Sequence, residues 1–172
     1  MNIFYLDENP NVAATMHCNK HVVKMILESA QLLSTAHRIL DGDDKKQLSN
    51  NTYNAIMYKA THMNHPSAKW ARESSEHYHW LYKLFIALCD EYTYRYNKVH
   101  ASDTKLRHIL DKLPKNIQDN GFVPPPQAMP DYCKNTDTVV AYRTYYINEK
   151  SKMLDYKLRE KPSWIITNTK NQ

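Results

Sequence analysis

The stretch from Asn11 to Leu40, NVAATMHCNKHVVKMILESAQLLSTAHRIL, contains neither proline nor glycine. Apolar residues recur along it at helical spacing, which predicts a long amphipathic helix. These residues are Val22, Ile26, Ala30, Leu33 and Leu40, with Val23 and Leu27 widening the stripe. We therefore expect the rest of the chain to pack against the apolar face of this helix.

The opposite face of the predicted helix carries polar side chains in steps of three or four residues. The row consists of Lys20, Lys24, Glu28, Gln31, Thr35 and Arg38, with His21 beside its start. Spacing alone favours a solvated charged surface. However, a single carboxylate among three cations also suits an acid group that works beside a phosphate-bearing ligand.

The composition indicates one domain with a mildly basic surface. The chain has 172 residues, 23 Lys and Arg against 18 Asp and Glu, and a pI near 9.0. This charge is compatible with a polyanionic partner but does not identify one. Only two glycines are present, which argues against glycine-rich phosphate loops and hairpin-rich β architecture.

The cysteine pattern favours a reducing compartment. Cys18, Cys89 and Cys133 are odd in number and far apart, so a disulfide framework is not indicated. We see no signal peptide at the start and no apolar run that approaches a membrane span of roughly 18 residues. The sequence therefore predicts an intracellular protein with no membrane partner.

The rest of the chain also reads as helical. After an extended lead-in, we expect helices at 52–63, from Pro66 to about Val99 with a bend near 73–75, at 104–113, and at about 137–159. The proline-rich stretch 114–136 is expected to be an ordered strap that buries Phe122, Val123 and Met129. The predicted fold class is all-α: a compact bundle of about four to six helices with a long central helix and a proline-rich ordered loop.

Metal and cofactor motifs are lacking. His17 and His21 lie one helical turn apart, but HCNKH lacks the glutamate that follows the first histidine of HExxH. Nucleophile elbows, Walker motifs and dinucleotide fingerprints are also missing from the sequence. We expect no metal and no cofactor.

Three segments resemble one family. NKHVVKMILESAQLL (residues 19–33) is similar to the first helix of the phage pyrimidine-dimer DNA glycosylase/AP lyases, the endonuclease V type, and their bacterial relatives. KPSWI (161–165) looks like that family's basic–Pro–Ser/Thr–Trp motif after the last helix. Asn64-His65-Pro66, followed by Trp70 and Arg72, resembles the segment that opens the central helix of the bacterial relatives.

This resemblance implies a single glycosylase-like helical domain, residues 1–172, with DNA-directed chemistry. In that family a backbone amine at the N-terminus attacks C1′ of the target nucleotide, a Glu assists opening of the sugar ring, and a lyase step cuts the strand. The matching catalytic residues here are Met1, through its amine, and Glu28. The implied substrate contacts are Lys20, His21, Lys24, Gln31, Arg38, Asn64, His65, Arg72, Lys161 and Trp164.

The sequence departs from the family pattern at two places. Asn2 is a residue before which the initiator Met is normally retained, so the candidate amine is on Met1. Leu27 and Gln31 stand where the phage enzymes carry DNA-gripping arginines. Three functions therefore stay open: a DNA glycosylase/lyase for a damaged or modified pyrimidine, an enzyme for a free nucleotide or modified base, and a non-catalytic phage protein that binds nucleotides or nucleic acid. The expected location is the cytoplasm, that of the host cell if the protein is phage-encoded, and the oligomeric state is left open.

Overall fold

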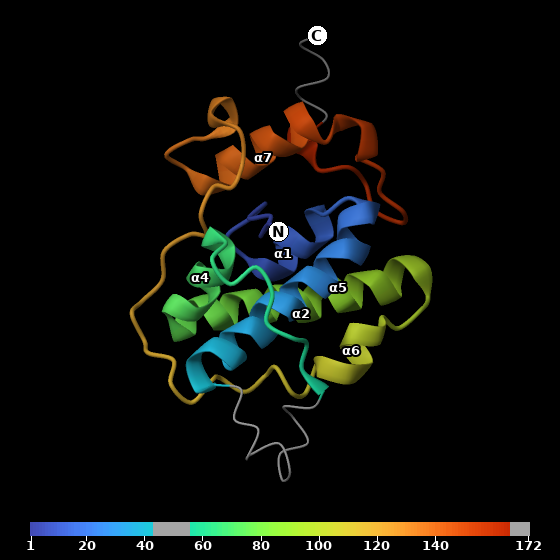
Figure 1. Ribbon diagram of the computed structural model, residues 1–172. Coiled ribbons are helices and arrows are strands. Elements are labelled where there is room, and N and C mark those ends of the chain that lie inside the picture. Colours follow the sequence, from blue (N-terminus) through green and yellow to red (C-terminus); the bar gives the residue numbers. More distant parts are fainter. Residues whose placement is uncertain (43–55, 166–172) are drawn as a thin grey trace.

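The computed structural model describes residues 1–42 and 56–165. Within these ranges the chain forms helices and contains no strand, which confirms the all-α prediction (Figure 1). The α-helices are α1 (Pro10–Met16), α2 (Asn19–Asp41), α4 (Pro66–Glu73), α5 (Ser75–Tyr96), α6 (Ala101–Leu106) and α7 (Thr138–Glu149). Two 3-10 turns, η1 (Asp131–Cys133) and η2 (Ser151–Met153), flank α7. No helix in the described ranges has both the length and the apolar character that crossing a membrane requires.

The predicted first helix is interrupted at residues 17–18, and this break separates α1 from α2. In a continuous helix, Thr15 O would accept a hydrogen bond from Asn19 N. Instead, Arg95 Nη2 donates to Thr15 O at 3.0 Å, and Asn19 N donates to Asp155 O at 2.8 Å. Distant parts of the chain thus satisfy both groups, which is why the local sequence did not predict the break.

Arg95 of α5 is the centre of a buried ionic network, and its side chain is only 1% exposed. Its Nε donates to Glu91 at 2.8 Å, and its Nη1 donates to His17 O at 2.8 Å and Asn19 Oδ1 at 3.1 Å. Arg159 adds two hydrogen bonds to Glu91, at 2.9 and 3.0 Å. Burial alone would raise the pKa of Glu91, but the hydrogen bonds from Arg159 and Arg95 outweigh it and lower that pKa. Arg95 therefore ties α5 to the α1–α2 junction.

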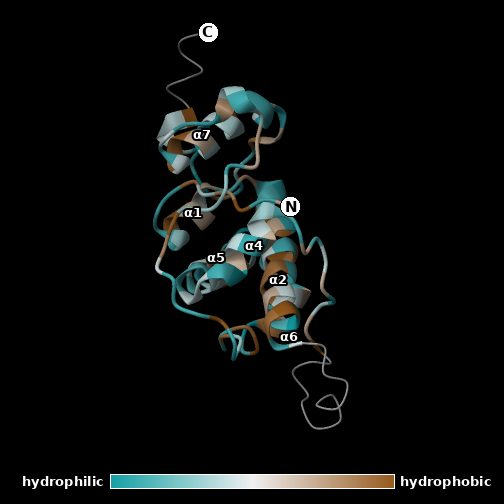
Figure 2. Ribbon diagram, turned by 60° about the vertical axis from the view of Figure 1, so that its left-hand side comes forward, coloured by the Kyte–Doolittle hydropathy of each residue, from teal (hydrophilic) through white to brown (hydrophobic). Residues whose placement is uncertain are grey.

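The start of the chain fills the space between α7 and α2. α2 packs against α5 and α4, and apolar residues are prominent along it (Figure 2). Residues 3–6 are buried, and the ring of Phe4 contacts three aromatic rings of α7. These rings belong to Tyr142, Tyr145 and Tyr146. The N-terminal segment is thus part of the core.

Sequence periodicity located the central pair of helices well and the shorter helices less well. Pro66 begins α4, and the predicted bend occurs at Ser74, whose hydroxyl caps α5. The expected helix at 52–63 is wrong for residues 57–63, which are not helical. Residue 56 is helical, and residues 52–55 lie outside the described residues.

Two other helices differ from their predicted bounds. The short helix expected at 104–113 is instead α6, at 101–106, and His100 caps it in place of the expected Ser102 or Asp103. The final helix ends at Glu149, about ten residues earlier than predicted, because the chain then turns back to hydrogen-bond Asn19.

The strap at 114–136 is held in part by hydrogen bonds of its backbone. Phe122 and Val123 are 37% and 58% exposed, so the prediction that they bury is wrong. Val123 instead donates its N–H to His77 Nε2 at 3.0 Å and accepts at its carbonyl from Trp70 Nε1 at 2.9 Å. Farther along, Met129 packs partly buried against the core, as expected.

Several histidines are kept neutral by burial. Burial lowers the pKa of His17 to about 4 and that of His21 to about 3. His65 and His100 cap α4 and α6 by accepting a backbone N–H at Nδ1, and burial lowers the pKa of each. Protonation would convert these Nδ1 acceptors into donors and break the caps.

We expect Arg95→Met to lower the free energy of unfolding by on the order of 3–5 kcal/mol, because it removes one partner of a buried charge and leaves Glu91 with Arg159 alone. Urea unfolding followed by circular dichroism measures the effect. The control is Lys134→Met, which breaks the exposed ion pair with Asp131 and should leave stability unchanged. Equal stability of the two variants would contradict the assigned role of Arg95.

We also expect stability to fall as the pH drops below about 6.5. A histidine whose folded-state pKa is lowered takes up its proton more readily when unfolded, so its contribution is complete above the unfolded pKa and is lost as the pH falls. Between pH 7 and pH 5 the loss is on the order of 2 kcal/mol for each of His17 and His21. Urea unfolding at a series of pH values measures this loss.

The variant His100→Asn tests the contribution of the histidine cap of α6 alone. His100→Asn keeps an N-cap acceptor but does not titrate, so its stability relative to wild type should rise as the pH falls. His79→Asn, an exposed change on α5, is the control and should track the wild type. A flat difference between His100→Asn and wild type would show that the neutral cap is not needed.

Candidate active site

The polar row predicted on the first helix lies along α2, and its first half faces solvent. Lys20 and Lys24 are exposed, whereas Glu28 and Gln31 are half-buried. Successive residues of an α-helix are rotated by about 100°, which places Glu28 on the edge between the exposed lysines and the buried face of α2. The carboxylate thus sits at the border between solvent and core.

The apolar stripe is narrower than the sequence indicated. Val23 and Leu27, expected to widen it, are 38% and 40% exposed and lie on the solvent side of α2. The core face is already filled by fully buried neighbours, among them Val22 and Ile26. The surface near Glu28 is therefore both cationic and apolar.

His21 lies beneath this surface and positions the start of the chain. It is 5% exposed, its ring stacks on Phe4 with a centroid distance of 4.3 Å, and its Nδ1 is hydrogen-bonded to Tyr146 Oη at 2.6 Å. Burial, with the charges of His17, Lys150 and Lys24 acting in the same direction, lowers the pKa of His21 to about 3. The ring is thus neutral near pH 7 and holds Phe4 rather than facing solvent.

The amino terminus is held by groups from three parts of the chain. Asn2 Nδ2 donates to Ala128 O of the strap at 3.1 Å, and Tyr142 Oη of α7 donates to Asn2 Oδ1 at 3.5 Å. On the α4 side, burial, the positive amine of the N-terminus and His62 all lower the pKa of His65. This effect indicates that the amine of Met1 lies near His65, at the start of α4.

Glu28 lies midway between two contacts that α2 makes with distant segments of the chain. Phe4 stacks on His21, seven residues before Glu28, and Thr61 is hydrogen-bonded to Thr35, seven residues after it. Seven residues are nearly two full turns, so all three α2 side chains share one face, with about 10.5 Å of axial rise between neighbours. Glu28 therefore lies on the face of α2 that also carries the contacts with Phe4 and Thr61.

The predicted Asn64-His65-Pro66 segment forms the turn that begins α4. Asn64 is exposed, and His65 is committed to capping through Nδ1, which accepts from Ser67 N at 3.1 Å. Arg72 Nη2 donates to Met63 O at 2.8 Å and so braces the turn, while its Nη1 is buried with no hydrogen-bond partner among the described residues. The turn is thus fixed from within and presents Asn64 outward.

Arg38 lies apart from the other predicted contacts. Its guanidinium donates to Met57 O at 2.9 Å and Tyr58 O at 3.2 Å, which ties the segment after residue 55 to α2. It is ten residues from Glu28, or about 15 Å along the helix. The structure therefore does not bring Arg38 to the group around Glu28.

The C-terminal motif packs on α7 near the beginning of α2. The ring of Trp164 lies 6.1 Å from that of Tyr146 and 5.4 Å from the guanidinium of Arg143. Since Tyr146 is hydrogen-bonded to His21, Trp164 reaches α2 through one intervening side chain. Lys161 is exposed.

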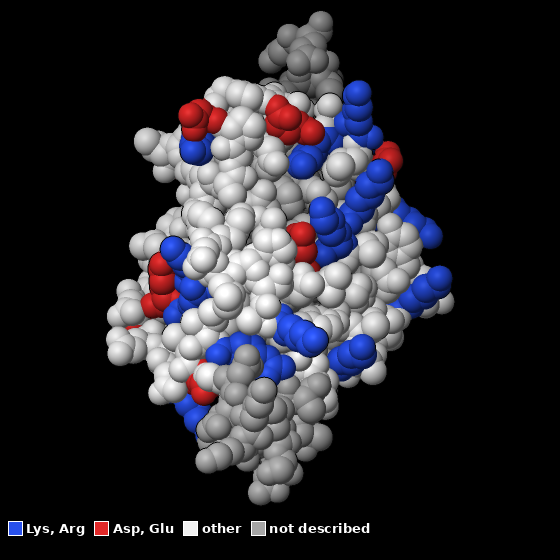
Figure 3. Space-filling view, in the orientation of Figure 1, with Lys and Arg blue, Asp and Glu red and all other residues white. Residues whose placement is uncertain are grey.

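A basic face, which we define as Lys20, Lys24, Lys150 and Lys157, surrounds the start of α2. Lys24 and Lys150 both influence the pKa of His21, and Lys157 N donates to Asn19 Oδ1 at 2.9 Å. Figure 3 shows Lys and Arg side chains along the side of the molecule where α2 begins and the chain after α7 returns. Such a surface favours a polyanion.

The sequence did not single out Phe4, Tyr146 or Lys150 as site residues. Phe4 and Tyr146 each belong to apolar runs whose only local signal is burial, and Lys150 lies at the end of a helix far from α2 in the sequence. Phe4 and Tyr146 contact His21 and Lys150 lowers its pKa, and these relations depend on tertiary packing, which spacing does not encode.

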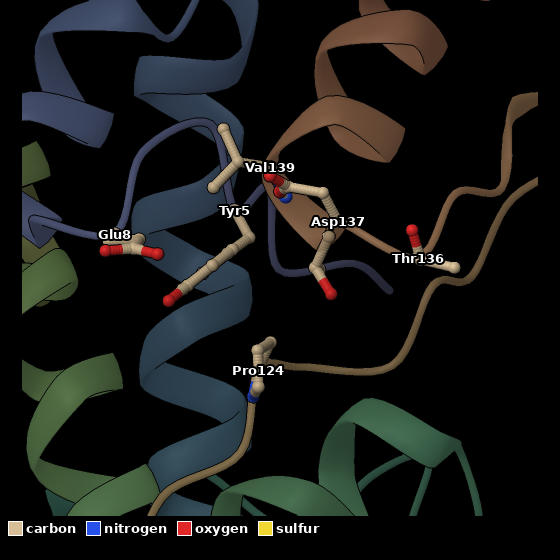
Figure 4. A pocket seen from close by; sticks show the side chains of 7 residues that line it. Tyr5, Glu8, Pro124, Thr136, Asp137 and Val139 are labelled. Atoms are coloured by element: carbon tan, nitrogen blue, oxygen red, sulfur yellow. Dashed lines mark hydrogen bonds between the residues drawn. The ribbon is translucent and has the colours of Figure 1, made fainter.

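One pocket beside the strap, of about 360 Å³, has the opposite charge to the basic face (Figure 4). It is lined by Tyr5, Glu8, Pro124, Thr136, Asp137, Thr138 and Val139. Burial raises the pKa of the Tyr5 hydroxyl, as do the negative charges of Glu8, Asp7 and Asp137. A pocket with this charge repels phosphate, so we do not assign it to a nucleic-acid backbone.

Metal-binding groups do not gather in the part of the chain that the structure describes. No set of three or more His, Cys, Asp or Glu side chains there is arranged to hold a metal ion. In particular, His17 Nδ1 donates to Ala13 O at 2.6 Å rather than pairing with His21 around a metal.

Comparison with known proteins identifies the family. The model of the pyrimidine dimer DNA glycosylase family matches residues 1–104, which include the N-terminal segment, α1, α2, α4 and α5. Neither the curated proteins nor the solved structures contain a match. Since the family model covers more than half of the 172 residues, the chain belongs to the pyrimidine dimer DNA glycosylase family.

Proposed function

We propose that the protein cleaves the N-glycosidic bond of a damaged or modified pyrimidine in DNA and then cuts the strand by a lyase step. The observation that carries this proposal is that the matched residues, 1–104, contain both proposed reactive groups, the amine of Met1 and the carboxylate of Glu28. They also contain the turn before α4 and the aromatic lead-in at Phe4, which in this proposal hold the amine near Glu28.

The two groups have complementary chemical tasks. A backbone amine in its neutral form is a nucleophile that can form a Schiff base with a sugar carbon. Its attack on C1′ expels the base and forms a Schiff base with the opened sugar. A carboxylate at Glu28 can stabilise the cationic character of the sugar and move protons during ring opening.

Other side chains have supporting tasks in this proposal. Lys20 and Lys24, both exposed, contact phosphates on either side of the target, and Lys161 extends the contact. His21 is a positioning residue, because it is neutral, buried and stacked on Phe4.

Of the remaining predicted substrate contacts, some can bind the nucleotide and others stabilise the fold. Gln31 and Asn64 can offer amide groups to the nucleotide, since one is half-buried beside Glu28 and the other is exposed before α4. His65, Arg72 and Trp164 hold the surrounding segments in place. Arg38 is outside the proposed catalytic group.

Borohydride trapping tests the proposed chemistry directly. The protein is mixed with duplex DNA that carries one cyclobutane pyrimidine dimer, or one abasic site, and treated with sodium borohydride. We expect a covalent protein–DNA adduct whose peptide map places the link at Met1. Binding without an adduct would favour a non-catalytic DNA-binding protein, whereas turnover of free nucleotides alone would favour a nucleotide-directed enzyme.

Glu28→Gln should lower the single-turnover rate on dimer-containing duplex by on the order of 10²–10³, because it removes a charge aimed at the developing sugar cation. The change is at the edge of α2 and should alter the free energy of unfolding by less than about 0.5 kcal/mol. Glu149→Gln, an exposed change at the end of α7, is the control and should keep the wild-type rate. A Glu28→Gln variant with wild-type turnover would remove the carboxylate from the mechanism.

A further inference from the structure

Two aliphatic side chains interrupt the cationic surface of α2 next to the proposed catalytic residue. Val23 and Leu27 lie one helical turn apart and are 38% and 40% exposed. The lysines Lys20 and Lys24 occupy the same part of the helix. Together they add an apolar strip to a basic surface.

Helix geometry places this pair close to the reaction centre. With about 100° between successive residues, Lys24 lies between Leu27 and Glu28 around the axis. Gln31, seven residues after Lys24, lies on the same side nearly two turns farther along. Leu27 and Glu28 thus flank Lys24 on opposite sides, so a polymer that lies across Lys24 covers both of them. Leu27 is the nearer of the two aliphatic residues to Glu28 in the sequence and on the helix.

The charges around the pair favour DNA over a second copy of this chain as the occupant. Self-association through α2 would bring Lys20 and Lys24 against the same lysines of the other copy, with Glu28 as the nearest carboxylate on that row. The neighbouring Lys150 and Lys157 would increase the repulsion. A polyanion with apolar base edges satisfies both parts of the surface at once.

We propose that Leu27, supported by Val23, inserts between bases at the target and holds the duplex open while Lys20 and Lys24 contact the flanking phosphates. This inference rests on the proposed function and assigns it a residue for duplex opening. Apolar side chains, leucine among them, serve other DNA-distorting proteins as wedges between base steps.

The proposal makes duplex opening depend on Leu27 and leaves bond cleavage independent of it. Leu27→Ala removes most of the apolar contact and should slow single-turnover cleavage of a dimer-containing duplex by about tenfold or more. The same variant should cleave the dimer in single-stranded DNA at the wild-type rate, because no opening is needed there. Leu27→Met, which keeps a long apolar side chain, should restore most of the duplex rate.

Ile39→Ala is the matched control. Ile39 is 38% exposed on the same helix, but twelve residues from Leu27, about 18 Å along the axis. The Ile39→Ala variant should cleave the dimer in duplex and in single-stranded DNA at the wild-type rates. A solubility or packing effect of losing any exposed aliphatic residue from α2 would slow Ile39→Ala as well.

Base unstacking is measured separately from cleavage. 2-Aminopurine placed beside the dimer fluoresces more strongly when it unstacks, and we expect wild-type protein to raise its signal more than Leu27→Ala does at saturating protein. This measurement needs binding but no catalysis, so it tests the wedge even if trapping shows that the protein is not a glycosylase. Equal fluorescence and equal duplex rates for Leu27→Ala and wild type would overturn the inference, as would a failure of the wild-type protein to bind duplex DNA.

Discussion

The buried guanidinium of Arg95 fixes the geometry on which the rest of the molecule depends. It reaches from α5 to the carbonyls of Thr15 and His17, and so occupies acceptors at the point where α1 would continue into α2. A buried charge is expensive unless it is paired and hydrogen-bonded. Glu91 supplies the negative charge that pairs with Arg95, and main-chain oxygens accept hydrogen bonds from the rest of the guanidinium. The break between the helices is thus a condition for burying Arg95.

This break also determines what surrounds the start of α2. Because Asn19 N is released from helical hydrogen bonding, it can bind Asp155 O, while the Asn19 side chain accepts from Lys157 N. The chain after α7 is thereby fastened beside the first turn of α2, and Tyr156 Oη completes the attachment by donating to Met16 O at 2.7 Å. The basic face is assembled from these two segments, which are more than a hundred residues apart in the sequence.

Local sequence patterns predicted those features that local physics determines. Apolar spacing located α2 and α5, and Pro66 and Ser74 marked the beginning of α4 and the bend before α5. Spacing also placed Glu28 and the lysines on one side of α2. It did not reveal the interruption at residues 17–18, since the hydrogen bonds that compensate for it come from Arg95 and Asp155.

The same limit applies to the candidate site. Helical periodicity assigned Val23 and Leu27 to the core because they are aliphatic, whereas the packing on either side of α2 leaves them in solvent. Arg38 belongs to the polar row by spacing, yet the carbonyls of Met57 and Tyr58 claim its guanidinium. A face of a helix can be assigned from one sequence, but the groups that cover it depend on segments that fold back from elsewhere.

The two proposed catalytic groups, Glu28 and the amine of Met1, are positioned in different ways. Glu28 lies on α2, whose backbone fixes its location, whereas the amine belongs to an extended segment. That segment is held at Phe4 by His21 and at Asn2 by the strap and α7. The strap and α7 lie outside the matched residues 1–104, and their contacts with Asn2 help to orient the amine. Precise placement of a nucleophile is worth a large part of a reaction barrier. The C-terminal part of this chain therefore contributes to the proposed chemistry by positioning the first residue, although neither reactive group comes from it.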